Sequence, residues 1–100
     1  MLSYGEANER FAEAVKEAPD NAELWCSWGV ALVELQQFEQ AIEKFREAVK
    51  HKPDFAPAWY GWGLALMAAG RRQEATEKFR KALEVDPNLA RELSGPECLV

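Results

Sequence analysis

Hydrophobic and polar positions alternate along the chain with the period of an α-helix. Apolar residues recur three and four positions apart, as on one face of a helix. Short polar segments containing a proline, at Pro19, Pro53 and Pro87, separate these stretches. Prolines of this kind end one helix before the next begins. The pattern predicts an all-α chain with helices at about 3–18, 21–35, 38–51, 55–69 and 72–85, and a short C-terminal cap near 88–94.

The helical pattern is itself repeated along the chain. Residues 22–55 align without gaps on residues 56–89, and 13 of the 34 aligned positions are identical. The positions shared by the first helices are spaced i, i+3, i+4 and i+7; they are Trp25, Trp28, Gly29 and Leu32 in one copy and Trp59, Trp62, Gly63 and Leu66 in the other. The second helices share Ala41, Phe45, Ala48 and Pro53, which recur as Ala75, Phe79, Ala82 and Pro87. A fixed period of this length is typical of stacked repeats.

The segment before the first full repeat has the pattern of a second helix alone. Ala7, Phe11, Ala14 and Pro19 lie one period before Ala41, Phe45, Ala48 and Pro53. We therefore divide the single domain 1–100 into a half repeat (1–21), two repeats (22–55 and 56–89), and a short cap and tail (90–100). The half repeat at the start fits both a complete chain and one part of a longer array.

Residue sizes at the shared positions predict two closely packed antiparallel helices in each repeat. Gly29 and Ala41 are small enough to let the two backbones approach, and the large rings of Trp25 and Phe45 fill the space beside them. Suitable N-caps precede the predicted helices at Asp20 or Asn21, Asp54 and Asn88. The charged positions of the second helices, such as Lys44 and Lys78, are expected on a solvated outer face.

Taken together, the pattern Trp-x2-large-Gly-x2-large, followed by Ala-x3-Phe, Ala and Pro, resembles the tetratricopeptide repeat over residues 1–89. Trp28 and Trp62 stand where leucine is usual, and Leu32 and Leu66 where tyrosine is usual. These departures change the packing size. The resemblance implies a right-handed superhelical stack of antiparallel helix pairs, a solenoid. It also implies a concave groove, lined by the first helix of each pair, that binds peptides or helices.

The resemblance also assigns positions of the first helices to the groove. They are Glu23, Cys26, Ser27, Val30, Val33 and Glu34 in one repeat and Pro57, Tyr60, Gly61, Leu64, Met67 and Ala68 in the next. Chaperone-binding members of the family hold a terminal carboxylate with lysine, arginine and asparagine, and none of these types occurs here. The resemblance therefore predicts an apolar peptide-binding groove formed by Cys26, Val30, Val33, Tyr60, Leu64 and Met67.

An apolar helical stripe is often plain core, but residues 55–70 carry no charge at all. Trp59, Trp62, Gly63 and Leu66 already supply the face toward the partner helix. A helix that is apolar all round needs further cover. We therefore expect a protein–protein interaction module, in a scaffold or adaptor role, that binds an apolar peptide or helix. The alternative is a self-assembling structural protein, for instance a homodimer, whose groove or uncapped ends form the contact.

Composition and charge argue against other classes of function. A formal net charge of -5 disfavours nucleic-acid binding. The uncharged stretch 55–70 is too short to span a membrane, and residues 1–16 lack the apolar segment of a secretory signal, so a cytoplasmic protein is expected. Cys26 and Cys98 form no close-spaced pair and His51 is the one histidine, so neither a metal site nor a cofactor is expected. His51 is expected at the end of an outer helix and Cys26 in the groove, on opposite sides of the helix layer, so a catalytic thiol–imidazole pair, and with it an enzyme, is not expected. We expect Cys26 to be a buried hydrophobic residue and not a reactive thiol.

Overall fold

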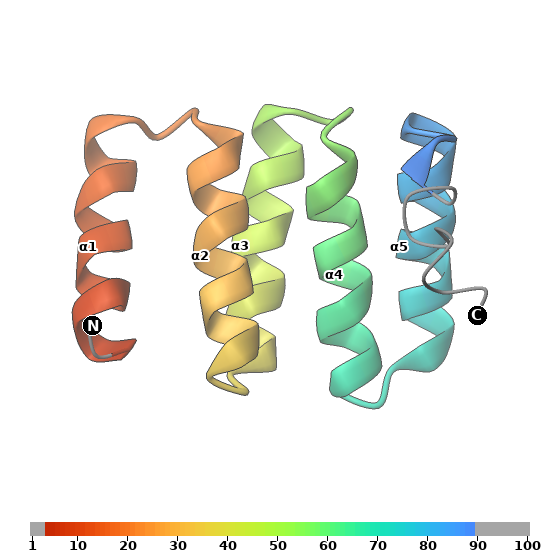
Figure 1. The fold of residues 1–100 in the computed structure, drawn as a ribbon, viewed down its shortest axis with the longest axis horizontal. Coiled ribbons are helices and arrows are strands. Elements are labelled where there is room, and N and C mark those ends of the chain that lie inside the picture. The colour runs from red at the N-terminus through yellow and green to blue at the C-terminus, as the bar shows by residue number, and fades with distance from the viewer. Residues whose placement is uncertain (1–3, 90–100) are drawn as a thin grey trace.

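The computed structural model describes residues 4–89, and in this range the chain forms five helices (Figure 1). They are α1 (Tyr4–Glu17), α2 (Ala22–Glu34), α3 (Phe38–His51), α4 (Ala56–Ala68) and α5 (Arg72–Val85). The predicted all-α fold is confirmed, and each helix begins and ends within about one residue of its predicted position. The predicted cap near 88–94 lies outside the described residues apart from its first two positions. Cys98 lies outside them as well.

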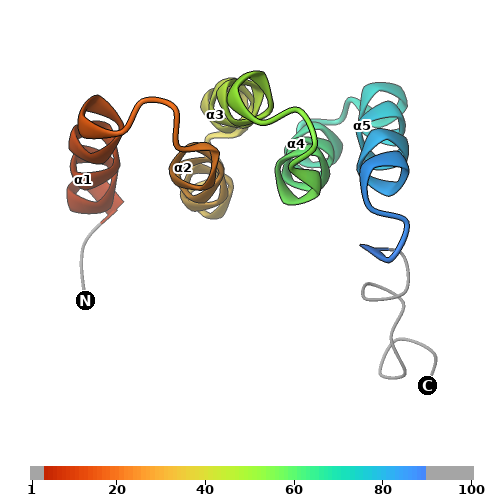
Figure 2. The ribbon, with the colours of Figure 1, turned by 90° about the horizontal axis from the view of Figure 1, so that it is seen from above.

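The helices form two antiparallel pairs, α2 with α3 and α4 with α5, preceded by α1. The chain runs through them from one end of the molecule to the other in sequence order (Figure 1). Seen along the helices, α3 lies to one side of α2 and α4 and packs against both (Figure 2). The first helices of the two pairs, α2 and α4, also contact each other. Side by side, they form one face of the stack, away from α3.

Local interactions explain where the helices begin. Asn21 is the N-cap of α2, because its side-chain oxygen accepts hydrogen bonds from the backbone N–H groups of Glu23 and Leu24, at 3.0 and 3.3 Å. The predicted cap Asp54 is wrong. Phe55 is the N-cap residue of α4 and makes no side-chain capping bond. Pro57 in the first turn of that helix has no N–H to satisfy, so the helix starts there without a polar cap.

The turns inside the two pairs have the same geometry. After α2, the N–H of Gln37 donates to the carbonyl of Leu32 at 2.9 Å and that of Gln36 to the carbonyl of Val33 at 2.9 Å, which is a Schellman motif. This motif needs a left-handed residue, and Gln36 has φ 63°. Gly70, at the equivalent position of the next repeat, takes the same role with φ 84° and without the strain that a Cβ introduces.

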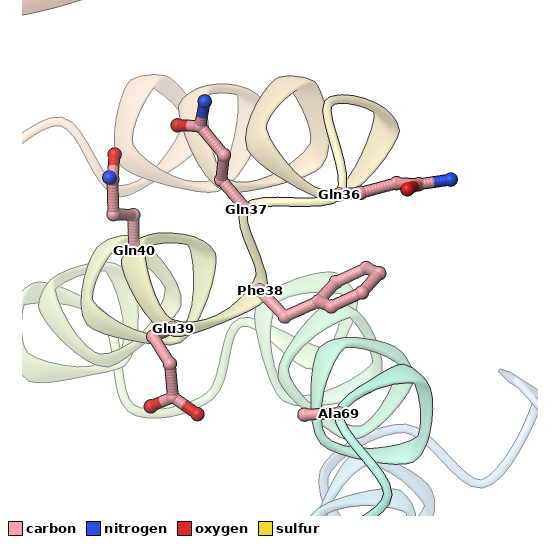
Figure 3. Close-up of a pocket in the computed structure, with 6 residues that line it drawn as sticks. All are labelled: Gln36, Gln37, Phe38, Glu39, Gln40 and Ala69. Atoms are coloured by element: carbon pink, nitrogen blue, oxygen red, sulfur yellow. The ribbon is translucent and has the colours of Figure 1, made fainter.

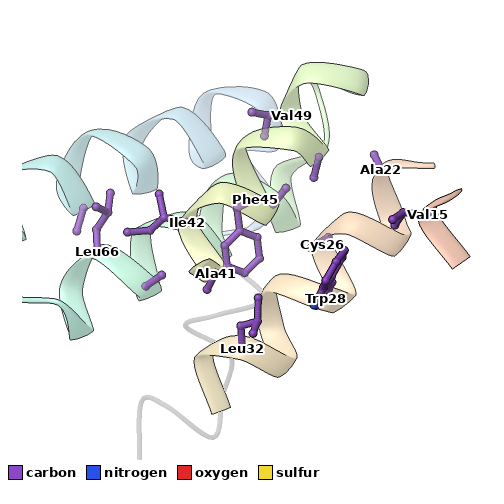
Figure 4. Packing of buried hydrophobic residues seen from close by; sticks show 14 residues of the cluster. Val15, Ala22, Cys26, Trp28, Leu32, Ala41, Ile42, Phe45, Val49 and Leu66 are labelled. Carbon is purple, nitrogen blue, oxygen red and sulfur yellow. The ribbon is translucent and has the colours of Figure 1, made fainter. Parts of the chain in front are cut away.

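The core is centred on Phe45, which is fully buried between the repeats. Figure 4 shows its ring projecting from α3 into the cluster that contains Leu32 and Ala41. A Cβ added to Gly29 of α2 would lie 2.8 Å from the ring, and one added to Gly61 of α4 would lie 2.5 Å from it. Both glycines therefore let helix backbones approach this ring. In the second repeat, Gly63 approaches Phe79 in the same way.

The first tryptophan of each repeat ties its helix to the preceding loop. The indole Nε1 of Trp25 donates a hydrogen bond of 2.7 Å to the carbonyl oxygen of Pro19, and Trp59 makes an equal bond of 2.7 Å to Pro53. The two bonds occupy equivalent positions of the two repeats. Because a proline follows each outer helix, the ring and the proline carbonyl together fix the path of the chain into the next pair.

The outer face differs from the purely solvated surface expected from the sequence. The ammonium group of Lys44 lies 4.0 Å from the ring centroid of Trp28, and that of Lys78 lies 4.1 Å from Trp62. Each is a cation–π contact, in which the lysine stem also covers apolar ring surface. Trp28 further donates from its indole nitrogen to the side-chain oxygen of Asn8 in α1. Trp28 thus links three consecutive helices, where leucine, the usual residue, has no such donor.

Candidate functional site: the α2–α4 face

Large apolar side chains are exposed on the face formed by α2 and α4. Val30 of α2 is 46% exposed, and Leu64 and Met67 of α4 are 43% and 42% exposed. Val30 and Leu64 occupy the same position of the two repeats, one residue beyond the glycine that packs on a phenylalanine ring. The glycine side of each helix faces its partner, and the residue that follows it lies about 100° further round the helix, where it is exposed. We call the surface around these side chains the α2–α4 face.

The other three predicted groove residues are more covered. Val33 is partly buried and packs against the core. Tyr60 is also partly buried, and its ring lies 5.4 Å from that of Phe79 with an interplanar angle of 46°. Cys26 is buried. Of the six predicted groove residues, Val30, Leu64 and Met67 are therefore exposed, whereas Tyr60, Val33 and Cys26 are partly or fully buried.

Gly61 has a different environment from the one its groove position suggests. It is buried, and the ring of Phe45 occupies the space in which its side chain would lie. Sequence reasoning missed this role because the first repeat has serine, not glycine, at the equivalent position 27. The available signal was a second glycine in the middle of a helix, where glycine is unfavourable unless the backbone must approach a neighbour.

The α2–α4 face has acidic groups at its border and no basic ones on its helices. Neither α2 nor α4 contains lysine or arginine, and α4 contains no charged residue. The charged residues of α2 are Glu23 and Glu34, and both are exposed. Both glutamates occupy groove positions that the family resemblance assigns, but neither is among the residues predicted to bind the peptide. The face is therefore an apolar surface whose own helices carry two carboxylates and no cation.

Cys26 carries the thiol of this region, and its burial explains why a low reactivity is expected. Desolvation, with a smaller contribution from the negative charge of Glu23, raises the pKa of Cys26 to about 11. A thiol reacts as its thiolate, so Cys26 is poorly suited to nucleophilic or redox chemistry near neutral pH.

We expect Cys26 to be alkylated by iodoacetamide at pH 8 at least tenfold more slowly in the folded protein than in urea. A Cys98→Ser variant leaves it as the single thiol, and mass spectrometry follows the reaction. Because the unfolded thiol has the lower pKa, the unfolded state loses its proton first as the pH rises above about 8.5. The free energy of unfolding therefore falls as the pH rises between the two pKa values, and this loss persists above about 11. Equal alkylation rates in the two states would contradict the burial.

A second surface feature links the repeats but offers little for binding. A hollow is lined by Gln36, Gln37, Phe38, Glu39, Gln40 and Ala69. Figure 3 shows Phe38 extending from the start of α3 toward the side on which Ala69 lies. Beside this hollow, Arg71 contacts Glu39 at 3.2 Å and Glu74 at 2.7 Å. The hydrogen bond to Glu74, with the negative charges of both carboxylates, raises the pKa of Arg71. This network joins α3 to the α4–α5 turn.

Two further observations concern the described part of the chain. Within residues 4–89, no three His, Cys, Asp or Glu side chains gather in a way that could hold a metal ion. No helix in the same range combines the length and apolar character that crossing a membrane requires.

The repeat geometry agrees with a family model. Residues 26–90 match the model of the tetratricopeptide repeat. The chain belongs to the tetratricopeptide repeat family. This match covers α3, α4 and α5 and all of α2 except its first turn. No curated protein sequence matches the chain.

Solved structures of this family have the same arrangement of helices. A crystal structure of MamA is 27% identical, with a TM-score of 0.79 over 88% of this chain and 48% of that one. The complex of the TPR2B domain of yeast Sti1 with pHsp70 is 25% identical, with a TM-score of 0.83 over 95% of this chain and 76% of that one. The second tetratricopeptide domain of Spaghetti (RPAP3), bound to the HSP90 peptide SRMEEVD, is 23% identical, with a TM-score of 0.78 over 83% and 77% of the chains; it shows the fold alone. The chain spans about half the length of the MamA structure.

Proposed function

We propose that this tetratricopeptide protein is a protein–protein interaction module that binds an apolar polypeptide segment across the α2–α4 face. The observation that carries the proposal is the position of the exposed apolar residues. In the described part of the chain, four large hydrophobic side chains are exposed, and three of them, Val30, Leu64 and Met67, lie on this face. Neighbouring exposed apolar groups of this kind mark interaction sites on soluble proteins.

The layout of the face also suits a polypeptide ligand. Val30 and Leu64 lie at equivalent positions of two adjacent helices, so they present two apolar contacts that are one repeat apart. Gly61 and Gly63 fix α4 closely against the rings of Phe45 and Phe79, which makes the face rigid. A preorganised face loses little conformational entropy on binding. The pHsp70 complex of the similar Sti1 domain supports a polypeptide partner. In this role the protein acts as a scaffold or adaptor.

The direct test places a charge on the face. We expect Leu64→Asp to weaken binding of a 16-residue amphipathic helical peptide at least tenfold in isothermal calorimetry. The peptide carries leucines at helical spacing and uncharged polar residues elsewhere. The variant loses apolar contact area and must desolvate a carboxylate when the peptide binds. Since Leu64 is exposed, helicity by circular dichroism should be unchanged and stability should change by no more than about 1 kcal/mol.

Leu83→Asp is the matched control. Leu83 is 39% exposed on α5, outside the α2–α4 face, so the same chemical change is made at a similar exposure. This variant should bind the peptide as the wild type does. Equal weakening by both substitutions, or binding unaffected by Leu64→Asp, would place the site elsewhere.

Self-association is a second candidate function, favoured by a different surface. An apolar hollow on α1 is lined by Ala7, Arg10, Phe11 and Ala14, together with Leu24 of α2. Light scattering over a concentration series, on the wild type and both variants, separates the possibilities. A dimer that Leu64→Asp dissociates uses the α2–α4 face, whereas a dimer that resists it uses an end of the stack. A monomer at all concentrations removes this candidate.

A further inference from the structure

Basic and acidic residues are segregated between the two kinds of helix. Every lysine and arginine within residues 4–89 lies in α1, α3 or α5 or in a connecting turn. The helices that form the α2–α4 face carry only Glu23 and Glu34. Within the described residues, the charged side chains that belong to the helices of this face are therefore all acidic.

The two carboxylates lie on the same stripe of α2 as the central apolar contact. Glu23, Val30 and Glu34 are separated by seven and four residues, a spacing that keeps side chains on one face of a helix. All three are exposed. Within the described residues, neither glutamate forms an ion pair, because the ion pairs found there involve Glu39, Glu47 and Glu74. At each end of the apolar contact there is therefore one exposed carboxylate that has no ion pair among residues 4–89.

We infer that the ligand of this face is a cationic amphipathic helix, with an apolar stripe flanked by lysine or arginine. The inference rests on the function proposed above and specifies the partner's chemistry. Eleven residues separate Glu23 from Glu34, about 16 Å of helix. Two cations eleven residues apart on a bound helix that lies along α2 match this distance. The apolar stripe between them covers Val30 and Leu64, as in other helix-in-groove complexes.

The charges of the face favour a helix flanked by basic residues over a helix flanked by acidic residues. A helix flanked by Lys or Arg gains two attractive contacts, and complementary charge also speeds its association. A helix flanked by acidic residues meets two carboxylates, and neither α2 nor α4 carries a cation to offset them. Apolar contact alone does not distinguish the two ligands, so the preference comes from Glu23 and Glu34.

Three peptides test the inference. They share the same leucine stripe and carry Lys, Gln or Glu at two positions eleven residues apart. We expect the Lys peptide to bind the 100-residue chain about four- to tenfold more tightly than the Gln peptide at low salt, and the Glu peptide to bind most weakly. The difference should shrink at 0.5 M NaCl, because salt screens exposed charges. Isothermal calorimetry measures all three.

Matched variants assign the preference to the two glutamates. Glu23→Gln/Glu34→Gln should bind the Lys and Gln peptides alike. Glu43→Gln/Glu77→Gln, at exposed positions of α3 and α5, makes the same change in net charge and should keep the wild-type preference. Loss of the preference in the second variant would show that overall charge, and not this face, selects the ligand, and would overturn the inference.

The outcomes separate this inference from the proposed function. Equal binding of the three peptides, still abolished by Leu64→Asp, overturns the cationic ligand and leaves the apolar face as the binding site. No binding of any peptide overturns both. A Lys preference combined with binding of the Gln peptide that Leu64→Asp does not weaken places the ligand elsewhere and overturns the inference. A salt-sensitive dimer that excludes the Lys peptide and dissociates in the Glu23→Gln/Glu34→Gln variant makes a second copy the occupant, and overturns it as well.

Discussion

Replacing Phe45 with alanine should lower the free energy of unfolding by about 3 to 5 kcal/mol, the range for removing a large buried ring. The ring is fully buried and lies against Gly29 of the same repeat and Gly61 of the next. Its removal therefore leaves a cavity inside one pair and also between pairs. A domain of this size has about 5 to 15 kcal/mol of stability in total. Urea unfolding, followed by circular dichroism, measures the loss.

Phe79→Ala is the internal control for this prediction. Phe79 occupies the same position of the second repeat and packs on Gly63 and Tyr60, but it is only partly buried in the described structure. We expect its loss to be smaller than that of Phe45→Ala by about 1 kcal/mol or more. Equal losses would mean that the contact between Phe45 and Gly61 adds nothing to the coupling of the two repeats.

The sequence predicts the repeat unit well because the contacts inside one helix pair recur. Gly29 with Phe45 and Gly63 with Phe79 are such contacts, and they return once in each repeat. Helix positions follow from the same recurrence, since each copy supports the assignment of the other. The loop bonds of Trp25 and Trp59 are likewise repeated. Periodicity is therefore informative for interactions that every repeat makes.

A contact that occurs only once in the chain leaves no repeated pattern in the sequence. Gly61 meets Phe45 across the boundary between the repeats, and the first repeat has serine at that position. Arg71 joins Glu39 of the other repeat and is replaced by Gln37 one period earlier. Asp54 has a good capping side chain, yet α4 starts beside a proline that leaves one fewer N–H to cap. Each of these depends on geometry that one sequence does not contain.

The candidate site likewise combines features that the sequence predicts with features that depend on how the helices pack. Helical spacing identifies the residues of α2 and α4 that point away from their partners, but it does not predict how deeply each side chain is buried. Tyr60 and Leu64 share one stripe, and the structure packs Tyr60 on Phe79 while leaving Leu64 exposed. The acidic border was visible in the sequence, because charges can be counted along a helix. In the described chain, Glu23 and Glu34 make no ion pair with neighbouring helices. This depends on the three-dimensional packing and cannot be predicted from the sequence.

Replacing Gly61 with alanine should destabilise the protein by about 1 to 2 kcal/mol, although alanine is the better helix former. Helix propensity favours alanine by about 1 kcal/mol. The new Cβ, however, would lie 2.5 Å from the ring of Phe45. That ring is fully buried and lies against Gly29 on its other side, so it has no free space to move into. Overpacking costs about 1 to 3 kcal/mol, and because the ring cannot move away the cost here lies in the upper part of that range, about 2 to 3 kcal/mol, which leaves the stated net loss after the propensity gain.

A double-mutant cycle shows whether the loss comes from this contact. In a Phe45→Leu background the side chain is smaller, so Gly61→Ala should cost less than in the wild type, with a coupling energy of about 0.5 to 2 kcal/mol. Gly5→Ala in α1, where no neighbouring atom lies within 4 Å of the added Cβ, should cause no loss. Urea unfolding of the four cycle members gives the coupling. An unchanged cost in the Phe45→Leu background would mean that the ring does not limit the approach of α4 to α3, and that another contact sets the spacing between the repeats.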